Sequence, residues 1–104
     1  MGSWEISAPV WRWSDGNWFF LTVPDDVSDE IAEASEGTAG GFGSVRVEVT
    51  CGRTTWRTSL FPSKGANAYI LPMKKSVREA EALTGGDIAH VQVWLLQPAP
   101  PSAG

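Results

Sequence analysis

The residues whose chemistry suits ligand binding are mostly basic and lie between positions 56 and 78. They comprise five cations, one hydroxyl and two aromatic rings, namely Arg57, Lys64, Lys74, Lys75, Arg78, Ser59, Trp56 and Tyr69. Cations beside hydrogen-bonding groups recognise carboxylates and phosphates, and an aromatic ring supplies an apolar wall for the rest of a ligand. These eight residues are therefore the candidate site for a small anionic ligand or an acidic protein segment. The alternative is a solvated surface on which each cation is hydrated separately.

Two of these cations, Lys74 and Lys75, stand at the start of the second predicted helix. The dipole of a helix disfavours cations at that end, whereas its unpaired N–H groups favour an anion. Lys64 comes from the loop before the strand that leads into this helix. A barrel that folds both connections onto one end would therefore gather four positive charges, those of Lys64, Lys74, Lys75 and Arg78. A structural role for Arg78 is also open, either as a partner of Asp87 or as a cap on a loop.

Residues suited to catalysis are scarce. His90 is the single histidine and has no other His or Cys nearby in sequence, so a structural or surface position is expected. Cys51 ends a strand on its apolar face, which favours a buried, inert thiol. Ser59 lacks the context of a nucleophile, and the glycines of 37–43 lack the ending of a phosphate-binding loop. The sequence predicts no catalytic residue, no metal site and no cofactor, and it favours binding over catalysis.

The composition is typical of one small globular domain. The chain has 104 residues, of which 42% are hydrophobic and 19% charged. A lone cysteine, no leader-like N-terminus and no apolar run of about 20 residues predict a cytoplasmic protein without membrane contact. Six tryptophans are unusual in so short a chain. They either anchor a small core or mark a ligand or partner surface, and the sequence leaves both open.

Charge is distributed unevenly along the chain. Residues 1–52 hold nine acids and two bases, a net charge of −7, whereas residues 53–104 hold six bases and three acids, a net charge of +3. This division predicts a dipolar surface. Since the isoelectric point is about 4.8, duplex nucleic acid is not an expected partner, because its phosphates require a basic face.

Periodicity and breakers define eight elements. Six strands are expected, over residues 3–13, 18–23, 45–51, 54–60, 67–71 and 89–95. Two helices are expected, over residues 25–36 and 73–83. A phase change beside Pro9 indicates that the first strand is long and bent. The second is apolar throughout, so burial on both faces is expected. A break is expected over residues 61–65, and Pro24 and Pro72 end the strands that precede the helices.

Alternating apolar residues identify the predicted core. The side chains expected to point inward from two strands are Val45, Val47, Val49, Cys51, Ala89, Val91, Val93 and Leu95. The apolar face of the first helix is expected to contain Val27, Ile31 and Ala34, and that of the second Met73, Val77 and Ala80.

The two halves of the chain follow one pattern. Each has an apolar strand ended by proline, then a short helix, a glycine-containing loop and a valine-rich strand. This repetition predicts a mainly β fold, a small closed barrel of about six strands with two short α-helices, because closure protects the sheet edges of a small chain. We expect one domain over residues 1–96 and a disordered proline-rich tail over 97–104.

Several motifs resemble a known family, the domain of unknown function DUF1905, over about residues 4–96. The resemblance is carried by Ala8-Pro9-Val10-Trp11-Arg12-Trp13, Val23-Pro24 with Val27-Ser28-Asp29-Glu30-Ile31, Gly41-Phe42-Gly43-Ser44-Val45-Arg46-Val47, Thr58-Ser59-Leu60-Phe61-Pro62, and Leu71-Pro72 leading to Val77-Arg78-Glu79-Ala80 and Gly86-Asp87. It implies a double-split β-barrel, related in architecture to domains of the AbrB and MazE type. Those domains bind DNA through basic residues, which the acidic first half of this chain does not match.

The sequence thus favours two functions over a third, catalysis, which a titratable pair inside a cleft would support. The first is binding of a small anionic ligand or an acidic segment at the basic residues. The second is a protein-interaction or self-associating regulatory domain without catalytic activity, in which surface tryptophans form a contact with a partner or with another copy. A pocket near Arg57 and Arg78 would favour the first function, and a flat apolar patch would favour the second.

Overall fold

The structure of the protein is a computed structural model that describes residues 2–13, 16–35, 44–63 and 68–96. Its elements follow the chain in the order β1 (Ser3–Pro9), β2 (Trp11–Arg12), β3 (Phe19–Thr22), α1 (Asp25–Ala34), β4 (Val45–Cys51), β5 (Thr54–Pro62), β6 (Tyr69–Pro72), α2 (Lys75–Ala80) and β7 (Ile88–Leu95). Residues 14–15, the glycine-containing loop at 37–43, the predicted tail at 97–104 and Lys64 lie outside the described residues.

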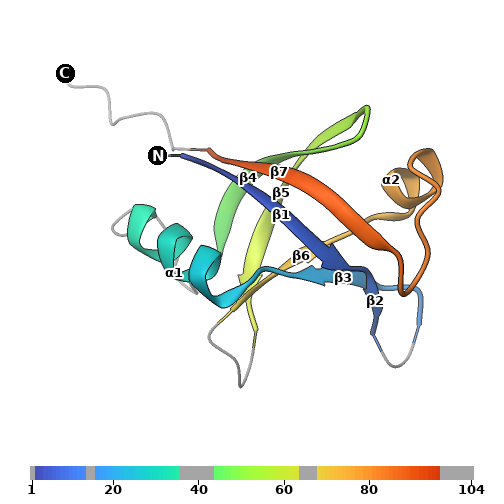
Figure 1. Cartoon of the computed structure of the whole chain (residues 1–104), viewed down its shortest axis with the longest axis horizontal. Coiled ribbons are helices and arrows are strands. Elements are labelled where there is room, and N and C mark those ends of the chain that lie inside the picture. Colours follow the sequence, from blue (N-terminus) through green and yellow to red (C-terminus); the bar gives the residue numbers. More distant parts are fainter. Residues whose placement is uncertain (1, 14–15, 36–43, 64–67, 97–104) are drawn as a thin grey trace.

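The strands form one curled antiparallel sheet in the order β1-β7-β4-β5-β6-β3-β2 (Figure 1). Its two end strands, β1 and β2, are consecutive in the chain and meet at Val10. The N–H of Val10 donates to the carbonyl of Asp87 over 2.8 Å, and its carbonyl accepts from the N–H of Gly86 over 2.7 Å. The sheet is therefore a nearly closed barrel with two helices, as predicted, with seven strands because β1 and β2 are separate.

Two long segments of chain each pair with two different neighbours along their length. The predicted single strand over 3–13 is divided at Val10, since β1 pairs with β7 and β2 pairs with β3. The predicted break over residues 61–65 begins two residues too early, because β5 continues through Pro62 and pairs there with β6. The N–H of Ser63 donates to Ala68. Pro62 is thus in a non-hydrogen-bonded pair, where its missing N–H costs nothing.

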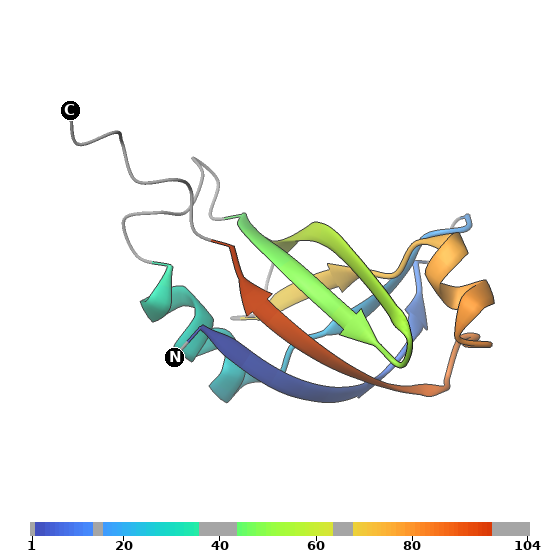
Figure 2. The same cartoon turned by 90° about the horizontal axis from the view of Figure 1, so that it is seen from above.

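The strand pairing reflects the two-half pattern of the sequence. The units β3-α1-β4 and β6-α2-β7 have the same order, and their equivalent strands pair with each other, β3 with β6 and β4 with β7. Leu21 lies opposite Leu71 at the centre of the first pairing. Because β3 and β6 are antiparallel and a helix follows each of them, the two helices lie at opposite ends of the barrel (Figures 1 and 2).

The core fills the inside of the barrel. Seven of the eight predicted inward side chains of β4 and β7 are buried, and Leu95 is half-buried against them. Each helix adds one fully buried side chain, Ile31 from α1 and Val77 from α2. Both helices are shorter than predicted, and Ala34 and Ala80 are exposed because the helices contact the barrel ends along a narrower stripe.

The strand β3 is not buried on both faces. Leu21 and Val23 point into the core, whereas Thr22 is exposed and Trp18, just before the strand, is 66% exposed. Phe20 lies on the outer face of this strand, and none of the described elements covers that face. Sequence alone cannot separate that case from burial on both faces.

A buried hydroxyl joins α1 to the barrel. The Oγ atom of Ser28 donates to the carbonyl of Val23 over 3.1 Å and accepts from the N–H of Tyr69 over 3.1 Å. One side chain of α1 therefore contacts the end of β3 and the start of β6. Because both partners are backbone groups, the contact fixes the position of the helix at this end of the barrel.

We expect Val47→Asp to lower the free energy of unfolding by about 3 to 5 kcal/mol, because it places an unpaired charge in the core. Val47 is fully buried. Chemical denaturation measures the change, and Arg46→Asp, on the exposed face of the same strand, is the control with an expected change within about 1 kcal/mol. Equal denaturation midpoints for Val47→Asp and wild type would contradict the inward orientation of this face.

We expect Ser28→Ala to lower the free energy of unfolding by about 1 to 3 kcal/mol, because two backbone groups lose their partner. The matched control is Ser76→Ala on the exposed side of α2, for which we expect a change within about 0.5 kcal/mol. Thermal and urea unfolding both measure the difference. If the two variants are equally stable, the Ser28 bridge does not position α1.

Candidate functional site

A hollow of about 630 Å³ lies between the turn before β3 and the start of α2. Its wall is formed by Asn17, Trp18, Phe19, Pro72, Met73, Lys74, Lys75, Arg78 and Glu79. The antiparallel pairing of β3 with β6 creates it, because the beginning of one strand then lies beside the end of the other. The N–H of Met73 donates to the carbonyl of Phe19 over 2.8 Å and fixes this junction.

Arg78 is the most firmly held cation in the hollow. Its Nε donates to the carbonyl of Met73 over 3.0 Å, and its guanidinium carbon lies 3.9 Å from the centre of the Phe19 ring. Its two terminal nitrogens have no partner among the described residues, and Asp87 instead accepts from the N–H of Thr84 over 2.8 Å. Of the structural roles predicted for Arg78, it has the contact with a loop carbonyl and not the ion pair with Asp87.

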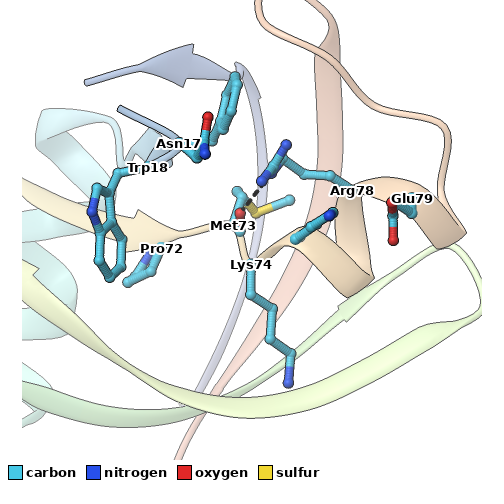
Figure 3. A pocket seen from close by; sticks show the side chains of 9 residues that line it. Asn17, Trp18, Pro72, Met73, Lys74, Arg78 and Glu79 are labelled. Carbon is cyan, nitrogen blue, oxygen red and sulfur yellow. Dashed lines mark hydrogen bonds between the residues drawn. The ribbon is translucent and has the colours of Figure 1, made fainter. Parts of the chain in front are cut away.

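The opposite side of the hollow is aromatic and apolar. Figure 3 shows Trp18 and Pro72 on one side of the hollow and the guanidinium of Arg78 on the other, with the side-chain amide of Asn17 nearby. The carbonyl of Trp18 accepts from the N–H of Trp13 over 2.8 Å, which closes the hairpin that carries it. A ligand with a flat ring could therefore stack on the indole of Trp18, with the guanidinium of Arg78 and the amide of Asn17 at the edge of that ring.

Lys74 and Lys75 add positive charge at the rim. Both are exposed, and neither pairs with a carboxylate among the described residues. Lys74 extends away from Arg78 (Figure 3). With Glu79 on the same wall, three cations and one carboxylate give a net charge of +2. Because α2 has only six residues, its peptide dipole is small, and the charge of the hollow comes from side chains.

Four of the eight predicted site residues do not line this hollow, and a fifth is outside the part of the chain that the structure describes. Trp56 is buried inside the barrel, Tyr69 packs against the core, and Lys64 lies outside the described residues. Arg57 and Ser59 lie on the outer side of β5 and contact β4. The Nε of Arg57 is 3.3 Å from an oxygen of Glu48, and Ser59 accepts from Arg46 over 3.4 Å.

The sequence did not identify the opposite wall of the hollow. Asn17, Trp18 and Phe19 are about 55 positions away from α2 and carry no binding motif. The one signal in the sequence that could have located this wall was the proline that ends an apolar strand in each half of the chain. It predicted equivalent halves, and pairing of the two equivalent strands would have placed the start of one beside the end of the other.

A serine and the histidine meet on the outer face of the barrel. The Oγ of Ser7 is 2.6 Å from Nδ1 of His90, since the two residues pair across β1 and β7. A second hollow of about 350 Å³ adjoins them. Within the described residues, the ring of His90 has no carboxylate partner. The pair therefore lacks the third group that orients the histidine of a catalytic triad, and we interpret it as a cross-strand hydrogen bond.

Cys51 is a buried thiol next to an acid. It is 4% exposed, and burial raises its pKa above the ordinary value of 9.0, with the charge of Glu81 adding to the effect. Glu81 accepts from the hydroxyl of Thr54 over 2.7 Å, so α2 is tied to the β4–β5 hairpin. A raised pKa leaves the sulfur protonated and weakly nucleophilic at neutral pH, in agreement with an inert thiol.

The described residues contain no group of three His, Cys, Asp or Glu side chains that could hold a metal ion. None of the helices in these residues is long and apolar enough to cross a membrane.

We expect the Cys51 thiol of the native protein to react with a chromogenic disulfide at least about 100-fold more slowly than in the urea-unfolded protein. The folded state holds the thiol proton more tightly. The protonated thiol therefore makes its full contribution to stability below the ordinary pKa of cysteine, and this contribution decreases as the pH rises above that value. Cys51→Val, measured in parallel, should lose less stability than wild type above about pH 9. Rapid labelling of native protein would contradict this environment.

The comparisons with known proteins assign the chain to a family and leave its activity open. None of the curated proteins matches the sequence. The family model described as domain of unknown function (DUF1905) matches residues 7–93, from β1 into β7 and across the whole hollow. That match covers most of the chain, and the protein therefore belongs to the DUF1905 family.

Proposed function

We propose that this barrel binds a small anionic ligand with a flat ring in the hollow between Trp18 and Arg78. The supporting observation is a guanidinium whose orientation is fixed by Met73 and Phe19 while its terminal nitrogens have no partner among the described residues. Such an arginine requires no reorganisation to form a two-pronged contact with a carboxylate or phosphate.

The size and wall of the hollow fit this class of ligand. A volume of about 630 Å³ lies within the range of small-molecule sites. Trp18 would stack on the ring, Asn17 would donate to an oxygen of the anion, and Lys74 and Lys75 would raise the local concentration of anions. Arg57 and Ser59 have no part in this proposal, because their contacts with β4 are elsewhere.

The test is a fluorescence titration with benzoate, adenosine monophosphate and inorganic phosphate at low salt, using the exposed Trp18 as the reporter. A charged hydrogen-bonded contact contributes about 1.5 to 3 kcal/mol, so Arg78→Gln should weaken binding by about 10- to 150-fold. The matched control is Arg57→Gln, which removes an exposed cation outside the hollow and should leave the affinity within about twofold.

Trp18→Phe separates the reporter from the site, because it removes the contribution of Trp18 to the fluorescence while a ring remains to stack. Circular dichroism of each variant confirms folding. Equal affinities for wild type and Arg78→Gln, or no saturable response to any of the three ligands, would overturn the proposal.

A further inference from the structure

The outer face of the sheet around β3 and β6 is a continuous apolar surface. We call this surface the apolar face. Its side chains come from β2, β3, β5 and β6 and the residue after β2, and they are Trp11, Trp13, Phe20, Phe61, Ile70 and Pro72. Register places Trp11 beside Phe20, Phe20 beside Pro72, and Ile70 beside Phe61. None of the six belongs to the core or packs against it.

The apolar face is open to solvent within the described structure. Trp13 is 50% exposed and Phe61 is 45% exposed, while the other four side chains are half-buried by one another. Neighbouring rings are in contact, with the centres of Trp11 and Phe20 5.1 Å apart and those of Trp13 and Phe20 6.0 Å apart. The indole N–H of Trp11 donates to Thr22 over 2.9 Å, so covering it would leave no unpaired donor.

Opposite charges flank the two ends of the apolar face. The strands β3 and β6 are antiparallel, so the residues that follow them lie at opposite ends. After β3 come Asp25 and Asp26 at the start of α1, and after β6 come Lys74 and Lys75 at the start of α2. All four are exposed, and the helices they begin lie at opposite ends of the barrel (Figures 1 and 2).

This arrangement is complementary to itself. When two copies place their apolar faces together about a twofold axis that crosses the strands, the acidic end of each copy meets the basic end of the other. From this charge complementarity we infer that the apolar face is the contact surface of a symmetric homodimer, with Asp25 and Asp26 of each copy opposite Lys74 and Lys75 of the second.

The inferred contact is small. Four strands spaced about 4.8 Å apart give a strip only about 20 Å wide, which is at the lower end of stable interfaces. We therefore expect a weak dimer, observable by sedimentation velocity over about 1 to 500 μM, that dissociates further as salt screens the charged ends.

The apolar contribution is tested with Phe61→Glu, which should weaken dimerisation by at least about tenfold because a charge is covered. The matched control is Ile88→Glu. Ile88 is 52% exposed at the start of β7, outside the apolar face, so its substitution should leave the dimer unchanged.

The charge arrangement is tested by mixing two double variants, Asp25→Lys with Asp26→Lys and Lys74→Glu with Lys75→Glu. Each variant alone brings like charges together at both ends and should remain monomeric. In an equimolar mixture both ends become complementary again, so a heterodimer should form with an affinity near that of wild type. Its formation also demonstrates that both variants are folded.

A monomeric wild type at about 500 μM in low salt would overturn the inference, whether or not the protein binds vesicles or another protein. A wild-type dimer whose double variants also dimerise separately, or fail to combine, would overturn the proposed orientation. Arg78→Gln should not alter dimerisation, so failure of the ligand proposal and failure of the dimer are distinguishable.

Discussion

Neither half of the chain can complete its own hydrogen bonding, and this constraint underlies the rest of the structure. In the first half, β1 pairs with β7, and β4 pairs with both β5 and β7. One of the two neighbours of β3 is β6. These three partner strands, β5, β6 and β7, all come from the second half of the chain. Because unpaired backbone groups and uncovered apolar strand faces are both costly, the halves gain stability only together. The barrel, its core and its two end helices form from that interleaving.

The pairing of β3 with β6 also produces the surface features on which both proposals rest. Antiparallel pairing brings the turn before β3 to the start of α2 and so creates the hollow around Arg78. The same pairing places Phe20 and Ile70 on one outer face and sends the starts of α1 and α2 to opposite ends. Ligand site and contact face are thus consequences of one register, with Leu21 opposite Leu71 at its centre.

Sequence reasoning succeeded where a pattern reports burial directly. The alternation from Val45 to Cys51 identified the inward face of β4, and the two strand-ending prolines identified the repeated unit. It failed where the answer depended on register. Arg57 was grouped with Arg78 by charge, but the pairing of β5 with β4 places Arg57 opposite Glu48. The wall formed by Trp18 was missed because its neighbours come from a distant segment.

The six tryptophans divide in a way that composition cannot reveal. Trp56 is buried in the barrel, Trp4 packs against the core, Trp94 is half-buried, and Trp11 is half-buried and hydrogen-bonded. Trp13 and Trp18 are exposed and lie opposite each other in one hairpin. Trp13 contacts the ring of Phe20 in the apolar face, and Trp18 lines the hollow. The lysines at the start of α2 likewise border both features. If both proposals hold, an anion that neutralises these lysines weakens the dimer. By linkage, dimerisation then weakens binding of that anion by the same factor.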